Sequence, residues 1–146
     1  MTKDVLVRVK GTQFMDDEND VIEMITAGTF NEKNGKKYLI YDETIVEGGD
    51  QTHNIVKIWP DKVVTKRGLV DTHMTFECGK KHMCNYMTPV GLIILGITTS
   101  ALEVEEDETS MGIVISYALE MNGEYISGCG LEIYARDKGN GPWSLD

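Results

Sequence analysis

The sequence predicts an all-β fold, an antiparallel up-and-down meander that closes into a barrel of about eight to ten strands. Apolar and polar residues alternate along most of the chain, and helical spacing is not sustained over any long stretch. Turn-forming residues recur about every eight to twelve positions, as in sandwiches and barrels. Closing the meander removes its unpaired edges, so a barrel is favoured over an open sandwich.

Ten alternating segments define the expected strands. They span about residues 4–13, 20–30, 37–46, 51–59, 62–69, 72–77, 81–88, 92–104, 111–121 and 124–134. Asn34-Gly35 and Asn122-Gly123 are the dipeptides that supply a positive φ at both centres of a type I′ hairpin turn. Further reversals are expected at Gly48-Gly49, Pro60-Asp61 and Cys78-Gly79, and an acidic loop at Glu105–Ser110. Consecutive strands should therefore be neighbours.

The chain of 146 residues has the length of one domain. We expect a single β-barrel domain over residues 1–136 and a loosely ordered tail over 137–146, where Gly139, Gly141 and Pro142 surround Trp143.

The composition narrows the partners and the compartment. A net charge of −10 repels phosphate backbones and anionic membrane surfaces, so we expect neither nucleic acid nor membrane as a partner. The longest apolar run, Val90–Ile97, is too short to span a bilayer. Cys78, Cys84 and Cys129 are odd in number and lack a disulfide-framework spacing, as expected of free thiols in the cytoplasm.

Several segments resemble one bacterial family. The segments are DVLVRVKGTQ (4–13), YLIYDET (38–44), VTKRG (64–68), MTFECGKKH (74–82) and YMTPVG (86–91). On these residues the chain is similar to the YwiB-like family over about residues 4–134, most specifically at Tyr86–Gly91 behind Arg67-Gly68. The resemblance implies a lipocalin-like (calycin) barrel and no known activity, ligand, cofactor or catalytic residue. Val90 departs from the aromatic residue expected in many relatives, which would widen a pocket at that position.

Three motifs with chemical associations have simpler interpretations. Gly128-Cys129-Gly130 lacks the third glycine and the following helix of a dinucleotide site, so a β-bulge in the last strand is favoured. Cys78, His82 and Cys84 lack both zinc-knuckle spacing and a fourth ligand, so no metal is expected. His53 and His73 have the outward parity of their strands, and no catalytic residue is assigned.

Between residues 51 and 88, the alternate residues that share one face of the predicted strands include both apolar and polar side chains. A two-residue loop at Pro60-Asp61 places Val56 opposite Thr65 and Asn54 opposite Arg67. Ile58 and Val63 share this side, which is therefore the inner one. The antiparallel order then predicts a polar rim at one barrel end, formed by the candidate ligand-binding residues Thr52, Asn54, Arg67, Thr72 and Tyr86.

A guanidinium inside a narrow barrel needs a partner. Glu43 and Glu47 end the third strand at the same rim, so a buried ion pair of Arg67 with either carboxylate is one interpretation. The other is that Arg67 anchors an anionic or carbonyl group of a ligand that enters the open end. Both interpretations remain open at this point.

Between Val90 and Ile97, the residues on both faces of the predicted strand are apolar, although the outer face of an antiparallel barrel is normally polar and in contact with water. If Leu92 and Ile94 point inward, then Ile93, Leu95 and Ile97 form an outer stripe suited to a homodimer contact. Alternatively, a terminal segment that includes Trp143 covers the stripe.

The function predicted from these patterns is non-catalytic binding of an unidentified small molecule, an anionic one if Arg67 is its anchor, at the polar rim of a cytoplasmic barrel. The rival prediction is a protein-interaction or structural module with a side-chain-filled barrel. An enzyme ranks third, because only Glu43, Glu47 and His82 could supply a titratable pair.

Overall fold

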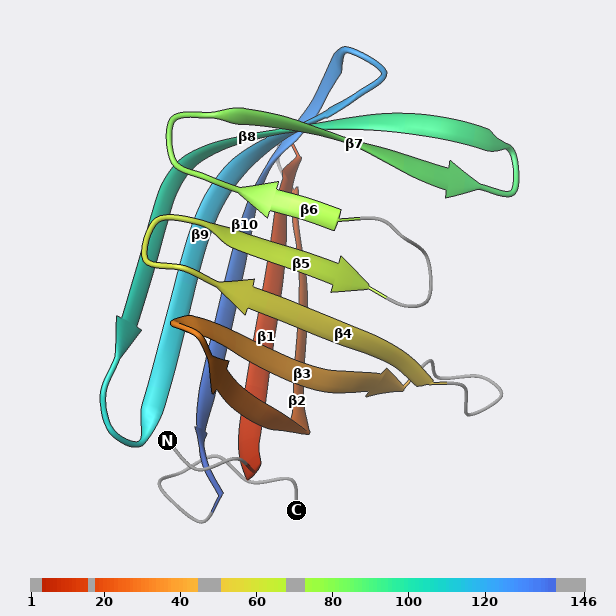
Figure 1. Ribbon diagram of the computed structural model, residues 1–146. Helices are drawn as coiled ribbons and strands as arrows, with labels where there is room; N and C mark the ends of the chain where they lie inside the picture. Colours follow the sequence, from red (N-terminus) through yellow and green to blue (C-terminus); the bar gives the residue numbers. More distant parts are fainter. Residues whose placement is uncertain (1–3, 16–17, 45–50, 68–72, 139–146) are drawn as a thin grey trace.

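The computed structural model describes residues 4–15, 18–44, 51–67 and 73–138, which form ten antiparallel strands (Figure 1). The strands are β1 (Asp4–Met15), β2 (Glu18–Lys33), β3 (Lys36–Thr44), β4 (Gln51–Ile58), β5 (Val63–Arg67), β6 (His73–Phe76), β7 (Lys81–Thr88), β8 (Gly91–Glu106), β9 (Ser110–Met121) and β10 (Glu124–Asp137). The predicted fold class is confirmed. Over these residues, no helix is long and apolar enough to cross a membrane.

The strands form one sheet that curves into a nearly closed barrel. Its order is β6-β5-β4-β3-β2-β1-β10-β9-β8-β7, so β1, the first strand, pairs with both β2 and the last strand, β10. Strands β3 to β6 make one wall, and β8, β9, β10 and β1 make the wall behind it (Figure 1). The sheet ends at β6 and β7, which leaves a seam between these two consecutive strands.

The predicted turns are found where the structure describes them. Asn34 and Gly35 have φ values of 54° and 78°, and Asn122 and Gly123 have φ values of 51° and 84°, as a type I′ turn requires. At the Pro60-Asp61 reversal, the Trp59 N–H donates a 2.8 Å hydrogen bond to the Lys62 carbonyl. The Asn54–Arg67 pairing that this loop predicts is confirmed. Gly48-Gly49 and residues 139–146 of the predicted tail lie outside the described residues.

Long strands turn the corners of the barrel by local irregularities. Strand β2 pairs with β1 up to Thr29 and with β3 from Gly28 onward, so it changes partner at Gly28. Strand β8 shifts register against β9 between Thr99 and Ala101. Strand β10 shifts between Tyr125 and Ser127, just before the Gly-Cys-Gly segment where a bulge was expected.

Because of the register shift in β8, the residues predicted to form an outer stripe do not face outward. Ile97 is fully buried in the core, whereas Leu92 and Ile94 are exposed. Ile93 and Leu95 share the parity of Ile97 and are half-buried. The extra residue at the shift reverses the alternation, so Leu102 and Val104 also pack on the core, as predicted, although they have the other parity. The parity assignment of Ile93, Leu95 and Ile97 to the outside was therefore wrong.

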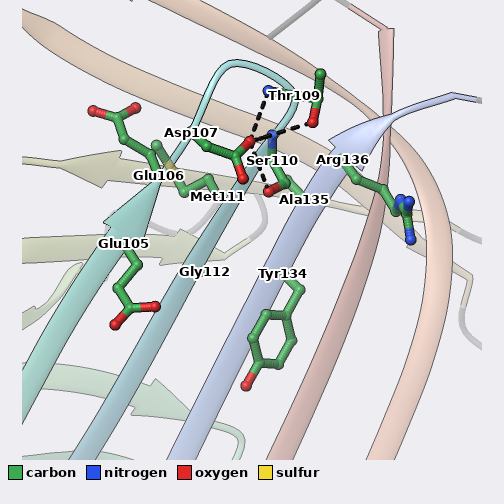
Figure 2. Close-up of a pocket in the computed structure, with 10 residues that line it drawn as sticks. All are labelled: Glu105, Glu106, Asp107, Thr109, Ser110, Met111, Gly112, Tyr134, Ala135 and Arg136. Carbon is green, nitrogen blue, oxygen red and sulfur yellow. Dashed lines mark hydrogen bonds between the residues drawn. The ribbon is translucent and has the colours of Figure 1, made fainter. Parts of the chain in front are cut away.

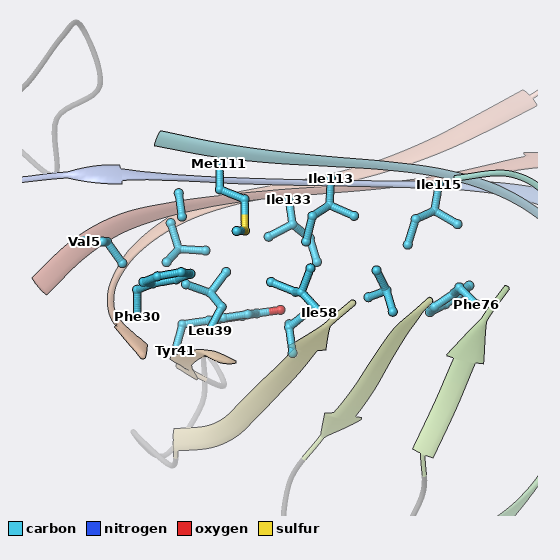
Figure 3. Close-up of a cluster of buried hydrophobic side chains, with 14 of the residues drawn as sticks. Val5, Phe30, Leu39, Tyr41, Ile58, Phe76, Met111, Ile113, Ile115 and Ile133 are labelled. Atoms are coloured by element: carbon cyan, nitrogen blue, oxygen red, sulfur yellow. The ribbon is translucent and has the colours of Figure 1, made fainter. Parts of the chain in front are cut away.

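The hydrophobic core fills one half of the barrel, toward the start of β1 and the end of β10 (Figure 3). It contains Val5, Val7, Phe30, Leu39, Tyr41, Val56, Ile58, Val63, Phe76, Ile97, Met111, Ile113, Ile115, Ile133 and Ala135. Phe76 meets Tyr117 edge to face, with 4.9 Å between ring centroids, where this core gives way to the other half of the interior.

Candidate functional site

The other half of the barrel interior is hollow. A cavity of about 340 Å³ lies there, toward the ends of β1, β3, β5 and β9. Its apolar wall consists of Val9, Met24, Met74, Phe76, Leu131 and Ile133. Its polar groups come from Tyr41, Glu43, Asn54, Thr65, Arg67 and Tyr117. The geometry is that of an apolar pocket with a few convergent polar groups, as is usual for small-molecule sites.

A second recess of about 250 Å³ adjoins the cavity. The two share Gly11, Ile22, Tyr117 and Leu131 as lining residues. We call the two together the chamber. A Cβ added to Gly11 would meet nothing within 4 Å, so the missing side chain leaves open space between the two parts. Gly11 thus widens the barrel where its core ends.

The polar rim predicted from the sequence is found in part. Asn54 is buried and lies opposite Arg67 in the β4–β5 register. Arg67 Nη2 donates a 2.9 Å hydrogen bond to Glu43 Oε2. Of the two predicted ion-pair partners, Glu43 is therefore confirmed, and Glu47 lies outside the described residues, as does Thr72.

The prediction that Arg67 is buried was wrong. Its side chain is 62 % exposed, because β5 ends at this residue and the guanidinium lies at the mouth of the barrel. Thr52 pairs with Glu43 in the backbone register, and its side chain is not among those that the structure describes.

Tyr86 does not join the rim. It pairs with Ile93 and so has the inward parity, but its side chain is 43 % exposed and does not line the chamber. The β7–β8 hairpin carries it beyond the barrel wall. Val90 lies at the same hairpin tip and is almost fully exposed, so its departure from the family pattern does not widen the chamber.

Two phenols line the chamber, one from the buried Tyr41 and one from the half-buried Tyr117. Burial raises the pKa of Tyr41 to about 12, with Glu43 adding to the rise and Arg67 opposing it. Burial, together with the Cys129 thiol, also raises the pKa of Tyr117. Both hydroxyls therefore remain protonated near neutral pH and can donate hydrogen bonds. With Arg67 paired to Glu43, the rim has no net charge.

A polar cluster beside the second recess was missed by the sequence reasoning. Gln13 Nε2 donates a 3.0 Å hydrogen bond to Ser127 Oγ. Ser127 Oγ lies 3.5 Å from the buried Cys129 Sγ. Strand alternation could have predicted that Gln13 points inward, because it lies an even number of residues from the inward-facing Val5, Val7 and Val9.

The residues weighed as metal ligands are engaged elsewhere. Cys78 Sγ donates to the Ser100 carbonyl at 3.4 Å, and His82 Nε2 lies 3.0 Å from Glu77 Oε1. Across the described ranges, no cluster of three or more His, Cys, Asp or Glu side chains could hold a metal ion. Cys84 packs against the core.

Another cavity, of about 420 Å³, lies at the β8–β9 loop and is a weaker candidate (Figure 2). Asp107 Oδ1 turns back onto this loop and accepts hydrogen bonds from the backbone N–H groups of Thr109 and Ser110 and from their hydroxyls (Figure 2). These bonds hold the pKa of Asp107 below its usual range. Oδ1 of this carboxylate therefore stabilises the turn.

Comparison with known proteins identifies the family. The model of the domain of unknown function DUF1934 matches residues 7–133, a range that contains every residue lining the chamber. The chain belongs to this family.

One relative matches both in sequence and in structure. The uncharacterized β-barrel protein YwiB of Bacillus subtilis (strain 168) is 29 % identical over 121 residues, which cover 82 % of this chain and 84 % of the relative. The crystal structure of YwiB from Bacillus subtilis superposes with a TM-score of 0.78 and 26 % identity over 92 % of each chain. The resemblance read from the sequence is therefore confirmed, together with its barrel fold.

Proposed function

We propose that this DUF1934 protein binds a small, largely apolar molecule in the chamber at the open end of its barrel, without chemistry and in the cytoplasm. The observation that carries the proposal is the hollow half of the interior around Gly11. A barrel of this size can be filled by side chains, and the half occupied by the core is filled in that way. The three free cysteines support the compartment.

The chamber favours a ligand with an apolar body and one uncharged polar head. Met24, Met74 and Leu131 provide an adaptable apolar wall. The Tyr41 hydroxyl, the Asn54 amide and the Thr65 hydroxyl can satisfy an alcohol, amide or carbonyl group. An anionic head would have to displace Glu43 from Arg67 or lie beside its carboxylate, so it is disfavoured.

The groups at the chamber support binding rather than catalysis. Glu43 is paired with Arg67, and the raised pKa values of Tyr41 and Tyr117 remove the phenols as bases near neutral pH. Of the other two titratable groups considered from the sequence, His82 lies against Glu77, and Glu47 lies outside the described residues. The polar groups that line the chamber therefore serve as hydrogen-bond partners.

Fluorescence of the neutral probe N-phenyl-1-naphthylamine tests the proposal. We expect the parent protein to enhance the emission of the probe, and Gly11→Leu to weaken binding at least about tenfold because the new side chain occupies the space where the two parts of the chamber meet. Ser116→Leu is the matched control, because it adds the same side chain to an exposed position beside Tyr117. Equal affinity in the parent and Gly11→Leu would place the probe elsewhere and refute the proposal.

Displacement of the probe tests the head group. Decanol and decanoate have the same chain length and differ in charge. We expect decanol to displace the probe at lower concentration than decanoate at neutral pH, because Glu43 shields Arg67. Stronger displacement by decanoate, abolished in Arg67→Met, would establish an anionic ligand with Arg67 as its anchor.

A further inference from the structure

A row of polar side chains crosses the inner face of the barrel at the level of the second recess. Backbone pairing places five polar residues side by side on the neighbouring strands β2, β1, β10, β9 and β8, namely Asp20, Gln13, Cys129, Tyr117 and Thr99. We call these five residues the polar row. Residues paired in register point to the same face of a sheet, and all of them except Thr99 line the recess.

The next row of inward-facing residues, on the side of the core, contains no polar side chain. It consists of Ile22, Gly11, Leu131, Ile115 and Leu102 on the same five strands. The inner face thus changes from apolar to polar over one step of about 7 Å along the strands. Apolar residues would fill the barrel at lower cost, because a buried polar group needs a hydrogen-bond partner. The polar row therefore does more than fill space.

The polar row has hydrogen-bonding capacity that the chain does not use. Gln13 Nε2 donates to Ser127 Oγ, but the amide oxygen and the second N–H of Gln13 have no partner among the described residues. A hydrogen bond joins the Tyr117 hydroxyl to the Cys129 thiol, and the Tyr117 oxygen can still accept another. Thr99 Oγ1 is buried and has no hydrogen-bond partner within the described ranges.

The chamber consequently has uncharged hydrogen-bonding groups on two opposite walls. Tyr41 and Thr65 belong to the wall of strands β3 to β6, whereas Gln13 and Tyr117 belong to the wall behind it (Figure 1). The other lining residues shared by the recess and the cavity are apolar or glycine. A ligand with an apolar body can therefore meet polar groups at both of its ends.

We propose that the ligand of the chamber carries a second uncharged hydrogen-bonding group, held by Gln13 and Tyr117, at the end of its apolar body opposite the first head group. This inference rests on the proposed function, because it divides the same chamber into two polar subsites. The exposed Asp20 carboxylate at the outer end of the polar row disfavours an anionic group there. An α,ω-diol is the simplest molecule of this class.

Displacement of N-phenyl-1-naphthylamine by alcohols and diols of equal length tests the second subsite. The pairs are the primary alcohols and the α,ω-diols of hexane, octane, decane and dodecane. At one length, we expect the diol to displace the probe at the same or a lower concentration than the alcohol, because the polar row satisfies the second hydroxyl. Diols of other lengths should be weaker than their alcohols, since the two subsites are a fixed distance apart and an unmatched hydroxyl is buried without a partner.

Two variants remove the proposed partners of the second hydroxyl. In Gln13→Leu and in Tyr117→Phe, the ratio of the half-displacement concentration of the diol to that of the alcohol should rise at least about tenfold at the best length. Tyr125→Phe is the matched control, because it removes the same hydroxyl from an exposed tyrosine of β10 that does not line the chamber. Its ratio should equal that of the parent.

The outcomes separate this inference from the proposed function. Diols that are weaker than their alcohols at every length in the parent, or a ratio that stays unchanged in either Gln13→Leu or Tyr117→Phe, would overturn the second subsite. The alcohols would still displace the probe in that case, and the chamber would hold a ligand with a single head group. Failure of both alcohols and diols to displace the probe from the parent would contradict the proposed function, and this inference with it.

Discussion

Arg67 on β5 and Glu43 on β3 form an ion pair across the intervening strand β4, with 2.9 Å between Nη2 and Oε2. Asn54 lies on β4 between them and pairs in register with Arg67. The pair closes one side of the chamber mouth, where the guanidinium is largely solvated. Its contribution to the free energy of unfolding should therefore be that of a surface ion pair.

Arg67→Met tests that assignment. We expect the free energy of unfolding in urea to change by less than about 1 kcal/mol, because exposed ion pairs contribute little. Adding Glu43→Gln should change it little further, since neither single variant leaves a buried charge. A loss of several kcal/mol in Arg67→Met, recovered in the double variant, would instead show a desolvated pair.

Tyr41 should make the fold sensitive to alkali. Its pKa is raised from 10.0 to about 12 in the folded protein because burial destabilises the phenolate. A raised folded pKa contributes stability that is complete below the unfolded pKa near 10.0 and is lost as the pH rises toward about 12. The loss from this residue approaches about 3 kcal/mol.

Urea unfolding of the parent and of Tyr41→Phe between about pH 8 and pH 11.5 measures this effect. The variant should lose less stability across the range. A smaller slope should remain in it, because the pKa of Tyr117 is raised as well. Parallel curves for the two proteins would show that Tyr41 ionises as readily in the folded chain as in the unfolded one.

Two inward-facing glycines should respond in opposite ways to the same substitution. At Gly28, where β2 changes partner, an added Cβ would lie 2.7 Å from the Ile40 carbonyl oxygen and 2.8 Å from Val7 Cγ2. Gly28→Ala should therefore destabilise the protein by about 1–3 kcal/mol. Gly11→Ala adds the same methyl group to open space and should be neutral or slightly stabilising. Equal thermal midpoints for the two variants would contradict this difference.

The sequence predicted those features that depend on local chemistry. The strands follow from alternation, the two Asn-Gly turns from their need for positive φ, and the Asn54–Arg67 pairing from the length of one loop. The exposure of Tyr86 was not predictable in this way, because parity gives the side of a strand but not how far that strand extends past its neighbours. The predicted burial of Arg67 was wrong for the same reason, because β5 ends at this residue.

The bulge in β8 was hidden for a different reason. Where both parities are apolar, as from Val90 to Ile97, a one-residue insertion leaves no mark in the hydropathy pattern. Counting backward from Leu102 and Val104 without the insertion reverses the predicted orientation of every earlier residue in the strand.

Ile97→Ala and Ile94→Ala measure that orientation directly. Ile97 is fully buried in the core, so its truncation should cost about 2–5 kcal/mol through lost transfer energy and a cavity. Ile94 is 40 % exposed, and its truncation should cost less than about 1 kcal/mol. Urea unfolding of both variants measures these effects. A larger loss at Ile94 than at Ile97 would contradict the inward orientation of Ile97 and restore Ile93, Leu95 and Ile97 as the outer stripe.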